Sequence, residues 1–477
     1  MRAIVWLRRD LRLEDNKALY HACSENSQVL AVFFLTPDQW KKHNDAPAKI
    51  DFWRANLALL KDSLASINIP LRLIETQNFS TIPGQLLRIA QIYGCDRLYY
   101  NVEYEYNEQQ RDAAVNNLLS PAGIKCNAYH DRILIEPGKV LSGSGKPYSV
   151  YTPFRKKWSE IILKTDFKPL PSPPKMRPFF IDGYSEQMNG ANSPFLEKTC
   201  TEWAPGEKEA ELRLQRFLNN SLNSYHENRD IPAIHGTSRL SPYLAAGVIS
   251  IRKCFNLLLQ SQQTQSGHLP DFSSSHGCWL NELIWREFYY HVMAAFPRVC
   301  KNLPFRLSTL KIPWQKNEAY LSAWQNGLTG YPIVDAGMRQ LAKTGWMHNR
   351  LRMITAMFLS KNLLIDWRLG ERWFMQNLID GDFAANNGGW QWSASTGTDA
   401  APYFRVFNPF SQSRRFDPEG IFIKTFCPEL QDISTKALHD PQKLQQEIMT
   451  KKIPYPKMIV DPAASRKRAI EAFKLNE

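Results

Sequence analysis

The first third of the chain alternates short apolar runs with segments of helical periodicity. The apolar runs predict buried strands at Ala3–Leu7, Val29–Leu35, Leu71–Glu75 and Arg97–Val102. Apolar residues at helical spacing predict helices at Asn16–Cys23, Ile50–Ser66, Leu86–Tyr93 and Glu108–Leu119. Strands that alternate with helices form a parallel sheet covered on both faces. We therefore expect an α/β domain with a doubly wound parallel sheet over residues 1–130.

The pattern changes after this region. The stretch from Phe167 to Glu207 is rich in proline, glycine, asparagine and serine, a composition that sustains neither a helix nor a central strand. From Glu209 onward strand signals nearly vanish and helical periodicity dominates, as far as a basic helical stretch at Ser465–Leu475. We expect a long interdomain linker over residues 131–206 and an all-helical domain over residues 207–477.

Composition narrows the class of protein. A chain of 477 residues is long enough for two domains, and 43% hydrophobic with 22% charged residues is ordinary for a soluble globular protein. The 59 lysines and arginines exceed the 46 acids, and the net charge of +13 favours a polyanionic partner such as nucleic acid. A solvated basic surface without a partner is the alternative that charge alone leaves open.

No apolar stretch approaches the roughly 20 residues of a membrane helix, and Met1–Asp10 becomes charged too soon for a signal peptide. The eight cysteines contain no CxxC pair, which argues against structural zinc and against a disulfide framework. We expect reduced thiols, no metal and a cytoplasmic protein.

Two positions exclude common phosphate-binding loops. Arg8–Arg12 follows the first predicted strand, where a dinucleotide-binding domain would carry its glycine fingerprint. Gly143–Lys146 is followed by Pro147 where a phosphate loop needs serine or threonine, so we expect a turn there.

The segment Asp380–Trp392 combines carboxylates, carboxamides, a glycine pair and two tryptophans. Glycine pairs weaken helices, and buried acids and amides need partners. Such residues suit a planar, nitrogen-rich, redox-active ligand. We interpret the segment as a cofactor site; a glycine-rich turn with incidental aromatic residues is the alternative.

In the helical segment Trp279–Tyr290, Glu282 lies three residues from both Trp279 and Trp285, so the three share one face. That face suits a cavity where tryptophan stacks on a base and a carboxyl group binds its edge. A Glu282–Arg286 ion pair beside two packing tryptophans is the alternative.

In Trp346–Met353, helical spacing places Asn349, Arg352 and Met353 on one face, which can pair with the acids of Asp380–Asp382. Arg350 and His348 point elsewhere, and His348 is expected to be structural.

Gly236–Pro242 stands at the mouth of a predicted helix and suits either a cofactor pyrophosphate or an ordinary serine cap. Trp314, Trp367 and Trp390 are far apart in sequence, and by themselves each is expected to be a core aromatic residue.

Together these motifs resemble the cryptochrome/photolyase family, and in particular its bacterial class I cyclobutane pyrimidine dimer photolyases. The resemblance runs from Val5–Arg12 to beyond Tyr403–Pro409. The motifs that carry it are Thr237–Ser241, Trp279–Tyr289, Gly330–Asp335, Trp346–Met353 and Ile379–Thr398.

The resemblance implies a carbon–carbon lyase in which photoexcited reduced FAD donates an electron to a dimer flipped out of DNA. It also implies an N-terminal antenna domain and a helical domain that holds a U-shaped FAD. The implied FAD-binding residues are Tyr225, Thr237, Ser238, Arg239, Leu240, Ser241, Trp279, Arg286, Asn349, Arg352, Asp380, Gly381, Asp382 and Asn386. Asn386 would face flavin N5, where a carboxamide can accept or donate. The implied electron relay is Trp390, Trp367 and Trp314.

The resemblance also implies the DNA contacts. Glu282 would hydrogen-bond the dimer, Trp285 and Trp392 would stack on its bases, and Met353 would line its apolar side. The other implied DNA-binding residues are Arg229, Arg286, Tyr289, Asn349, Arg350, Arg405 and Gln412. A 5,10-methenyltetrahydrofolate antenna is implied at His43, Asn107, Glu108, Cys300 and Lys301, with a deazaflavin as the alternative. We expect a monomer that acts on dimer-containing DNA without a protein partner.

Three rival functions are weaker. The (6-4) photolyases use two histidines where this chain has Asn349 and Met353. A cryptochrome-type photoreceptor would carry a long C-terminal extension, which is not expected here, and would lose the lesion-binding residues. A dark flavin oxidoreductase would need a nicotinamide site, and the sequence holds no glycine-rich fingerprint for one.

Overall fold

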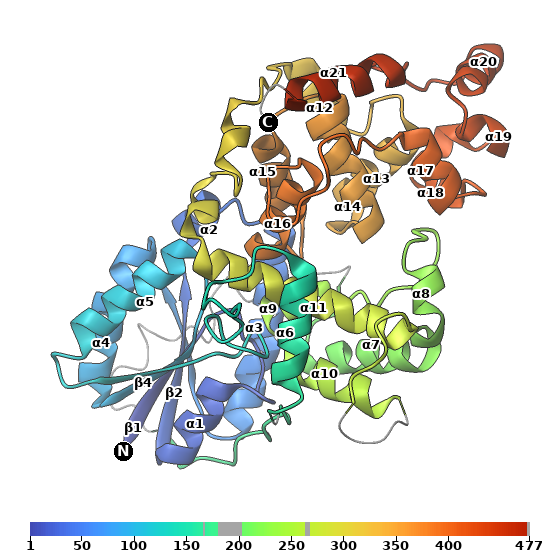
Figure 1. Ribbon diagram of the computed structural model, residues 1–477. Coiled ribbons are helices and arrows are strands. Elements are labelled where there is room, and N and C mark those ends of the chain that lie inside the picture. The colour runs from blue at the N-terminus through green and yellow to red at the C-terminus, as the bar shows by residue number, and fades with distance from the viewer. Residues whose placement is uncertain (166, 180–202, 263–267, 475–477) are drawn as a thin grey trace. The chain divides into compact units, whose positions relative to one another are not determined.

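The computed structural model describes residues 1–165, 167–179, 203–262 and 268–474. Its N-terminal part contains a five-stranded sheet of order β3-β2-β1-β4-β5, in which every neighbouring pair of strands is parallel (Figure 1). The strands are β1 (Arg2–Leu7), β2 (Gln28–Leu35), β3 (Leu71–Glu75), β4 (Arg97–Asn101) and β5 (Lys125–Tyr129). The helices are α1 (Lys17–Glu25), α2 (Pro37–Lys42), α3 (Pro47–Ser66), η1 (Phe79–Thr81), α4 (Ile82–Tyr93), α5 (Tyr106–Leu119) and α6 (Tyr151–Ile162). The predicted parallel sheet is confirmed.

Helices cover both faces of this sheet, as predicted. Alternate side chains of a strand point to opposite faces. Ile4 and Trp6 of β1 pack in one core with Leu86 of α4 and Val115 of α5. Helices α1 and α3 contact the sheet from its other side (Figure 1).

The fifth strand was not predicted. β5 carries the polar residues Lys125 and Asn127, and none of its side chains is buried. It pairs with β4 at the edge of the sheet. An edge strand does not need the continuous apolar run that marks a buried parallel strand.

Ion pairs fix the segment that follows β1. Arg8 donates to both oxygens of Asp112 at 2.7 and 2.8 Å, and Arg9 donates to Glu105 at 2.7 Å. Glu103, which follows β4, accepts from Arg9 and, at 2.9 Å, from Arg111. These ion pairs stand where a dinucleotide-binding fold would have its glycine loop.

A second buried network ties the sheet to the helical part of the chain. Asp131 accepts from Arg12 and, at 2.6 Å, from Arg252, and Arg252 also donates to Asp15 at 2.9 Å. Each of these four side chains is at most 4% exposed. Burial by itself would favour protonated Asp131, but the charges of Arg12 and Arg252 outweigh it and hold the pKa of that carboxyl below its ordinary value.

From residue 207 to 474, the described segments contain helices and no strand. The helices up to the π-helix η7 are α7 (Glu207–Asn220), η4 (Leu222–Ser224), α8 (Tyr225–Asn228), α9 (Ser241–Ala246), α10 (Ile251–Gln260), α11 (Ser275–Ala295), η5 (Pro297–Lys301), η6 (Leu307–Lys311), α12 (Glu318–Gln325), α13 (Pro332–Thr344), α14 (Asn349–Met357) and η7 (Phe358–Asn362). The remaining ones are α15 (Trp367–Asn377), α16 (Phe383–Ser393), α17 (Pro409–Phe416), α18 (Ile421–Phe426), η8 (Pro428–Leu430), α19 (Thr435–Leu438), α20 (Pro441–Lys451) and α21 (Pro462–Lys474).

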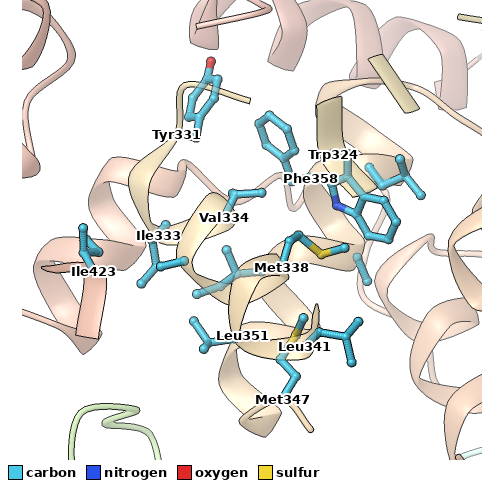
Figure 2. Close-up of a cluster of buried hydrophobic side chains, with 14 of the residues drawn as sticks. Trp324, Tyr331, Ile333, Val334, Met338, Leu341, Met347, Leu351, Phe358 and Ile423 are labelled. Atoms are coloured by element: carbon cyan, nitrogen blue, oxygen red, sulfur yellow. The ribbon is translucent and has the colours of Figure 1, made fainter. Parts of the chain in front are cut away.

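The C-terminal helices surround a core centred on α13. Val334 and Met338 of α13 pack with Leu351 of α14, Phe358 of η7 and Ile423 of α18 (Figure 2). The apolar periodicity of these segments therefore buries a shared core.

The chain packs into two compact units. Unit 1 comprises Met1–Asn220 and Ser238–Pro297, and unit 2 comprises Ser221–Thr237 and Arg298–Glu477. Helices α7, α9, α10 and α11 thus belong to the same unit as the sheet. The domain division at residues 130 and 206 stays a prediction.

The expected turn at Gly143–Lys146 is confirmed, because Gly145 donates its N–H to Ser142 O at 2.9 Å. Residues 167–179 form neither a helix nor a strand, as their composition predicts. Earlier in the predicted linker, Tyr151–Ile162 forms helix α6, and residues 166 and 180–202 lie outside the described residues.

We predict that Asp131→Asn destabilises the protein by about 3–5 kcal/mol, the usual effect of breaking a buried ion pair, because Arg12 and Arg252 lose a shared charge. Chemical denaturation at neutral pH measures the loss. Glu160→Gln is the control, since it removes a carboxylate that is 61% exposed in its pair with Lys157. Equal stability of the two variants would contradict the prediction. Since the folded pKa of Asp131 is lowered, its contribution should be fully present above the ordinary pKa and be lost progressively as the pH falls from there through the lowered pKa.

Candidate functional site

In unit 2, the face of α14 and the acids before α16 form the pair that the sequence predicts. Arg352 Nη2 donates to both oxygens of Asp380 at 2.7 and 3.0 Å. Its Nε donates to Met347 O at 2.8 Å, and the Asp380 side chain is 2% exposed. The guanidinium is thereby fixed between a carboxylate and a backbone carbonyl.

The segment Asp380–Trp392 forms a helix over most of its length, so the glycine-rich turn is excluded. Asp382 is the N-cap of α16, and its side chain accepts from Ala385 N at 3.1 Å. The pair Gly388-Gly389 lies inside α16 and does not end it. Gly381 is buried just before this cap.

Asn386 has a fixed orientation. Its Nδ2 donates to the backbone oxygen of Glu371 at 3.0 Å. A carbonyl oxygen can only accept, so the amide nitrogen must face Glu371 and Oδ1 is left as an acceptor for another donor. The hydrogen-bonding groups of Arg352, Asp380 and Asn386 include both donors and acceptors, so they fit a ring with both donor and acceptor nitrogens.

The three tryptophans of the implied relay share one core. Trp390 and Trp367 are each 2% exposed, and the partly exposed Trp314 packs against the same cluster. The three therefore belong to the same core although they are far apart in sequence, and Trp314 is the most exposed of them. Trp390 packs closely on α15, where a Cβ at Gly370 would lie 2.1 Å from its ring.

The other predicted residues on α14 and α16 are accessible. Asn349 is exposed, and Met353 and Trp392 are partly exposed, whereas Leu351 and Ile354 of α14 are buried. His348 caps α14, since its Nδ1 accepts from Arg350 N at 3.2 Å, which confirms its structural role.

Two predicted phosphate-binding arginines of unit 2 lie beside Asp230. Arg350 Nη2 donates to Asp230 at 2.7 Å, and Arg229 Nε lies 4.0 Å from the same carboxylate. Arg229 also stacks over the ring of the buried Tyr225, with its Cζ 5.6 Å from the centroid. Gln412 of α17 is partly exposed.

A buried lysine holds the loop that carries Arg405. Lys361 of η7 is 0% exposed, and its Nζ donates to Ser395 Oγ at 2.7 Å, to Tyr403 O at 3.1 Å and to Arg405 O at 3.0 Å. Burial, and then the charge of Arg405, lower the pKa of Lys361 to about 7. The side chain of Arg405 is left exposed to solvent.

In unit 1, α11 presents the other predicted aromatic residues. The ring of Trp285 stacks on Tyr151 of α6, with centroids 3.7 Å apart and planes at 7°. Tyr151 donates its hydroxyl to Asn281 Oδ1 at 2.6 Å, and burial and the charge of Glu282 raise the pKa of Tyr151. Trp285 is thus fixed on one face by a ring that keeps its proton.

The remaining predicted residues of α11 differ in exposure. Trp279 is 3% exposed and packs on Phe217 of α7 at 5.2 Å between centroids. Arg286 donates to Arg132 O at 2.6 Å. Glu282 and Tyr289 are partly exposed, and the Tyr289 ring lies 5.7 Å from that of Trp285.

Glu287 anchors α11 from its buried side. Its carboxylate accepts from Leu134 N at 2.9 Å, from Ile135 N at 2.8 Å and from Trp158 Nε1 at 2.9 Å. Burial raises the pKa of Glu287 to about 7 in spite of these three donors. The opposite side of α11 is therefore held in a defined orientation.

The predicted phosphate segment divides between the units. Thr237 ends the first stretch of unit 2, and Ser238–Ser241 belongs to unit 1. Ser241 is the first residue of α9, whose N-cap is Leu240, so the ordinary serine cap is not what the structure has. Arg239 has a φ of 50°, in the left-handed region that residues other than glycine rarely adopt.

Three residues predicted to bind folate meet in unit 1. Asn107 Nδ2 lies 3.1 Å from His43 Nε2, and His43 Nδ1 lies 3.7 Å from Glu108 Oε1. Burial lowers the pKa of His43, and burial and then the charge of Glu105 raise the pKa of Glu108 to about 8. At neutral pH the pair is therefore a neutral imidazole and a protonated carboxyl. Cys300 and Lys301 lie in η5.

Among the described residues, no helix is long and apolar enough to cross a membrane. None of the cysteines within the described segments forms a disulfide there, and Cys200 lies outside those segments.

Known protein families match both parts of the chain. Residues 279–475 match the family described as the FAD binding domain of DNA photolyase, and residues 3–175 match the DNA photolyase family. The chain is 45% identical to the deoxyribodipyrimidine photo-lyase of Salmonella typhimurium, over 99% of this chain and 98% of the relative. It is 44% identical to that of Escherichia coli K12, over the same shares of the two chains.

Solved structures give the same result. A bacterial class III photolyase from Agrobacterium tumefaciens superposes with a TM-score of 0.87 at 34% identity, covering 99% of this chain and 97% of that one. A cryptochrome from Synechocystis superposes with the same TM-score at 27% identity, covering 98% of each chain. The chain therefore belongs to the cryptochrome/photolyase family, and its C-terminal helical domain is an FAD-binding domain.

The sequence did not reveal the residues that support this site. Tyr151, Asp230, Lys361 and Glu287 each act on a partner more than 100 residues away, or on a loop more than 30 residues away. Helical spacing relates only close neighbours, so no periodic signal marks these residues.

Proposed function

We propose that this chain repairs cyclobutane pyrimidine dimers in DNA with the energy of blue or near-ultraviolet light. The observation that carries the proposal is the 45% identity to a deoxyribodipyrimidine photo-lyase over nearly the whole of both chains. When bound, reduced FAD supplies the electron that enters the dimer after light absorption and returns once the cyclobutane ring has split. The class I assignment rests on the sequence motifs.

The residues of unit 2 that would bind the flavin ring are Asn349, Arg352, Asp380, Gly381, Asp382 and Asn386. The Arg352–Asp380 pair offers an oriented guanidinium and carboxylate, and Asn386 offers an Oδ1 acceptor to flavin N5. Tyr225, Thr237–Ser241, Trp279 and Arg286 would bind the rest of the cofactor.

The dimer would leave the duplex, because its reacting bonds are out of reach inside the base stack, and photolyases are base-flipping enzymes. Trp285 and Trp392 would stack on its bases, Glu282 would hydrogen-bond them and Met353 would cover the apolar side. Trp285 is suited to this role because Tyr151 already holds one face of its ring.

Flanking phosphates would be bound by Arg229, Arg350, Arg405 and Gln412, with Tyr289 beside the lesion. Accessible arginines of this kind supply the salt-dependent part of DNA affinity. The Lys361 bonds support the role of Arg405, since they fix its backbone and leave its side chain in solvent.

We also propose a 5,10-methenyltetrahydrofolate antenna at His43, Asn107, Glu108, Cys300 and Lys301. The neighbouring polar groups of His43, Asn107 and Glu108 support it. A cytoplasmic monomer without a protein partner completes the proposal. A cryptochrome-type photoreceptor is less well supported, because the photolyase relatives are closer in sequence than the cryptochrome.

We predict that Trp285→Ala weakens binding to dimer-containing DNA by about 1–3 kcal/mol, the scale of one base–aromatic stack. Glu282→Ala should lower lesion affinity or the efficiency of splitting, and both variants should keep FAD. Binding measured in the dark and repair measured in the light separate the two effects. Unchanged discrimination between damaged and intact DNA in both variants would remove these residues from the substrate site.

The tryptophan relay gives a second prediction. Trp390→Phe keeps an aromatic ring that is much harder to oxidise, so light-driven reduction of the flavin should be lost or severely slowed. Trp314→Phe should block the outer end of the relay in the same way. Chemically reduced protein should still repair dimers, because the electron then comes from the flavin.

Gly370→Ala tests the role of Trp390 while leaving that tryptophan in the sequence. The added methyl would overlap the Trp390 ring and displace it, so photoreduction should slow. The overpacking should also lower the free energy of unfolding by about 1–3 kcal/mol. The control is Gly84→Ala in α4, where a Cβ meets nothing within 4 Å. Wild-type photoreduction in Trp390→Phe and Gly370→Ala would show that Trp390 is only a core residue.

The proposed antenna site predicts that folate binding releases a proton. A pterin ring presents N–H donors, which a carboxylate accepts better than a protonated carboxyl does. Because the pKa of Glu108 is raised to about 8, folate binding at pH 7 should release about one proton, and affinity should rise as the pH rises towards 8. Calorimetry in buffers of different ionisation enthalpy measures this release. The same proton release in Glu108→Gln would contradict the assignment.

A further inference from the structure

An acidic side chain stands among the proposed phosphate-binding residues. Asp230 Oδ2 accepts from Arg350 Nη2 at 2.7 Å, and its Oδ1 accepts from Arg350 Nε at 3.3 Å. Arg229 Nε lies 4.0 Å from the same Oδ1. The side chains of Asp230, Arg350 and Arg229 are 30%, 15% and 24% exposed, so all three are accessible to a ligand from solvent.

A carboxylate at this place has two physical consequences. It lowers the local charge from two guanidinium groups to a net single positive charge, which weakens the attraction of any DNA phosphate. It also fixes the fork of Arg350, because a two-point pair sets both the position and the plane of a guanidinium. The first effect lowers affinity for all DNA, whereas the second favours one geometry of the backbone.

The surroundings of Arg350 complete its orientation. Its Cζ lies 4.4 Å from the centroid of the Phe416 ring, and its backbone N–H is bonded to the His348 side chain. With Nε and one N–H of Nη2 engaged by Asp230, both N–H groups of Nη1 and the second N–H of Nη2 remain for phosphate oxygens. Arg350 therefore offers a phosphate the edge of its guanidinium that faces away from Asp230.

We propose that Asp230 is a specificity-determining residue of DNA binding. It holds Arg350 in one orientation that suits the backbone beside a lesion and offsets the charge that would otherwise retain undamaged DNA. This inference rests on the proposed contact of Arg229 and Arg350 with DNA phosphates.

The test is equilibrium binding to the same duplex with and without one thymine dimer, in the dark, over a series of salt concentrations. Asp230→Asn should raise affinity for undamaged DNA by about threefold to fivefold, the scale of one exposed ion pair. For this variant, the slope of log K against log salt concentration should become steeper by up to about 0.9, which corresponds to one additional phosphate contact. Affinity for the damaged duplex should rise less, so that the ratio between the two duplexes falls.

Asp432→Asn is the matched control, because Asp432 is an exposed aspartate of the same unit and its loss changes the net charge equally. Asp230→Glu keeps the charge and should restore most of the wild-type ratio. The flavin absorbance of each variant verifies that the protein is folded.

Arg350→Gln separates this inference from the function on which it rests. It should weaken binding to both duplexes and lower the salt dependence by about one phosphate contact. If Arg350→Gln leaves binding unchanged, the proposed phosphate contact is wrong. Suppose that Arg350→Gln does weaken binding. The role of Asp230 is then overturned if Asp230→Asn behaves like Asp432→Asn, or if Asp230→Asn weakens binding to both duplexes equally.

Discussion

The carboxylate of Asp131 is the constraint on which the arrangement of unit 1 depends. It accepts from Arg12, which follows the first strand, and from Arg252 of α10, so residues 240 positions apart are joined by buried side chains. Removing the Asp131 carboxylate would leave Arg12 and Arg252 buried with one countercharge fewer. Helix α11, which carries Trp279, Glu282 and Trp285, packs beside α10 in the same unit and is anchored separately by Glu287.

The same device recurs at the residues with proposed functions. Asp380 orients Arg352, Asp230 orients Arg350, and Glu287 anchors α11 through two backbone N–H groups and a tryptophan. In each case one buried or half-buried carboxylate fixes a side chain or helix more rigidly than apolar packing alone would do. A cofactor or a lesion then meets donors and rings that are already oriented, and less conformational entropy is lost on binding.

Much of this fold can be predicted from the sequence, and the failures have physical reasons. Strands β1 to β4 are mostly apolar and largely buried, whereas the edge strand β5 carries Lys125 and Asn127 and was missed. Helical spacing identified the face of Arg352 and Met353. The Gly388–Gly389 pair did not mark a turn, since it lies inside α16, whose start Asp382 caps. Tyr151 and Asp230 contact partners that are distant in sequence. Their roles follow from tertiary packing, which no local pattern records.

The most direct measurement is the return of thymine monomers from an oligonucleotide that carries a single cyclobutane dimer. The purified protein with chemically reduced FAD is mixed with this oligonucleotide, and one half is illuminated with blue or near-ultraviolet light while the other stays dark. The account predicts that monomers appear only in the illuminated half, and that they also appear with Trp390→Phe, since the reduced flavin needs no relay. Full retention of the dimer in the light, with reduced FAD bound, would contradict it.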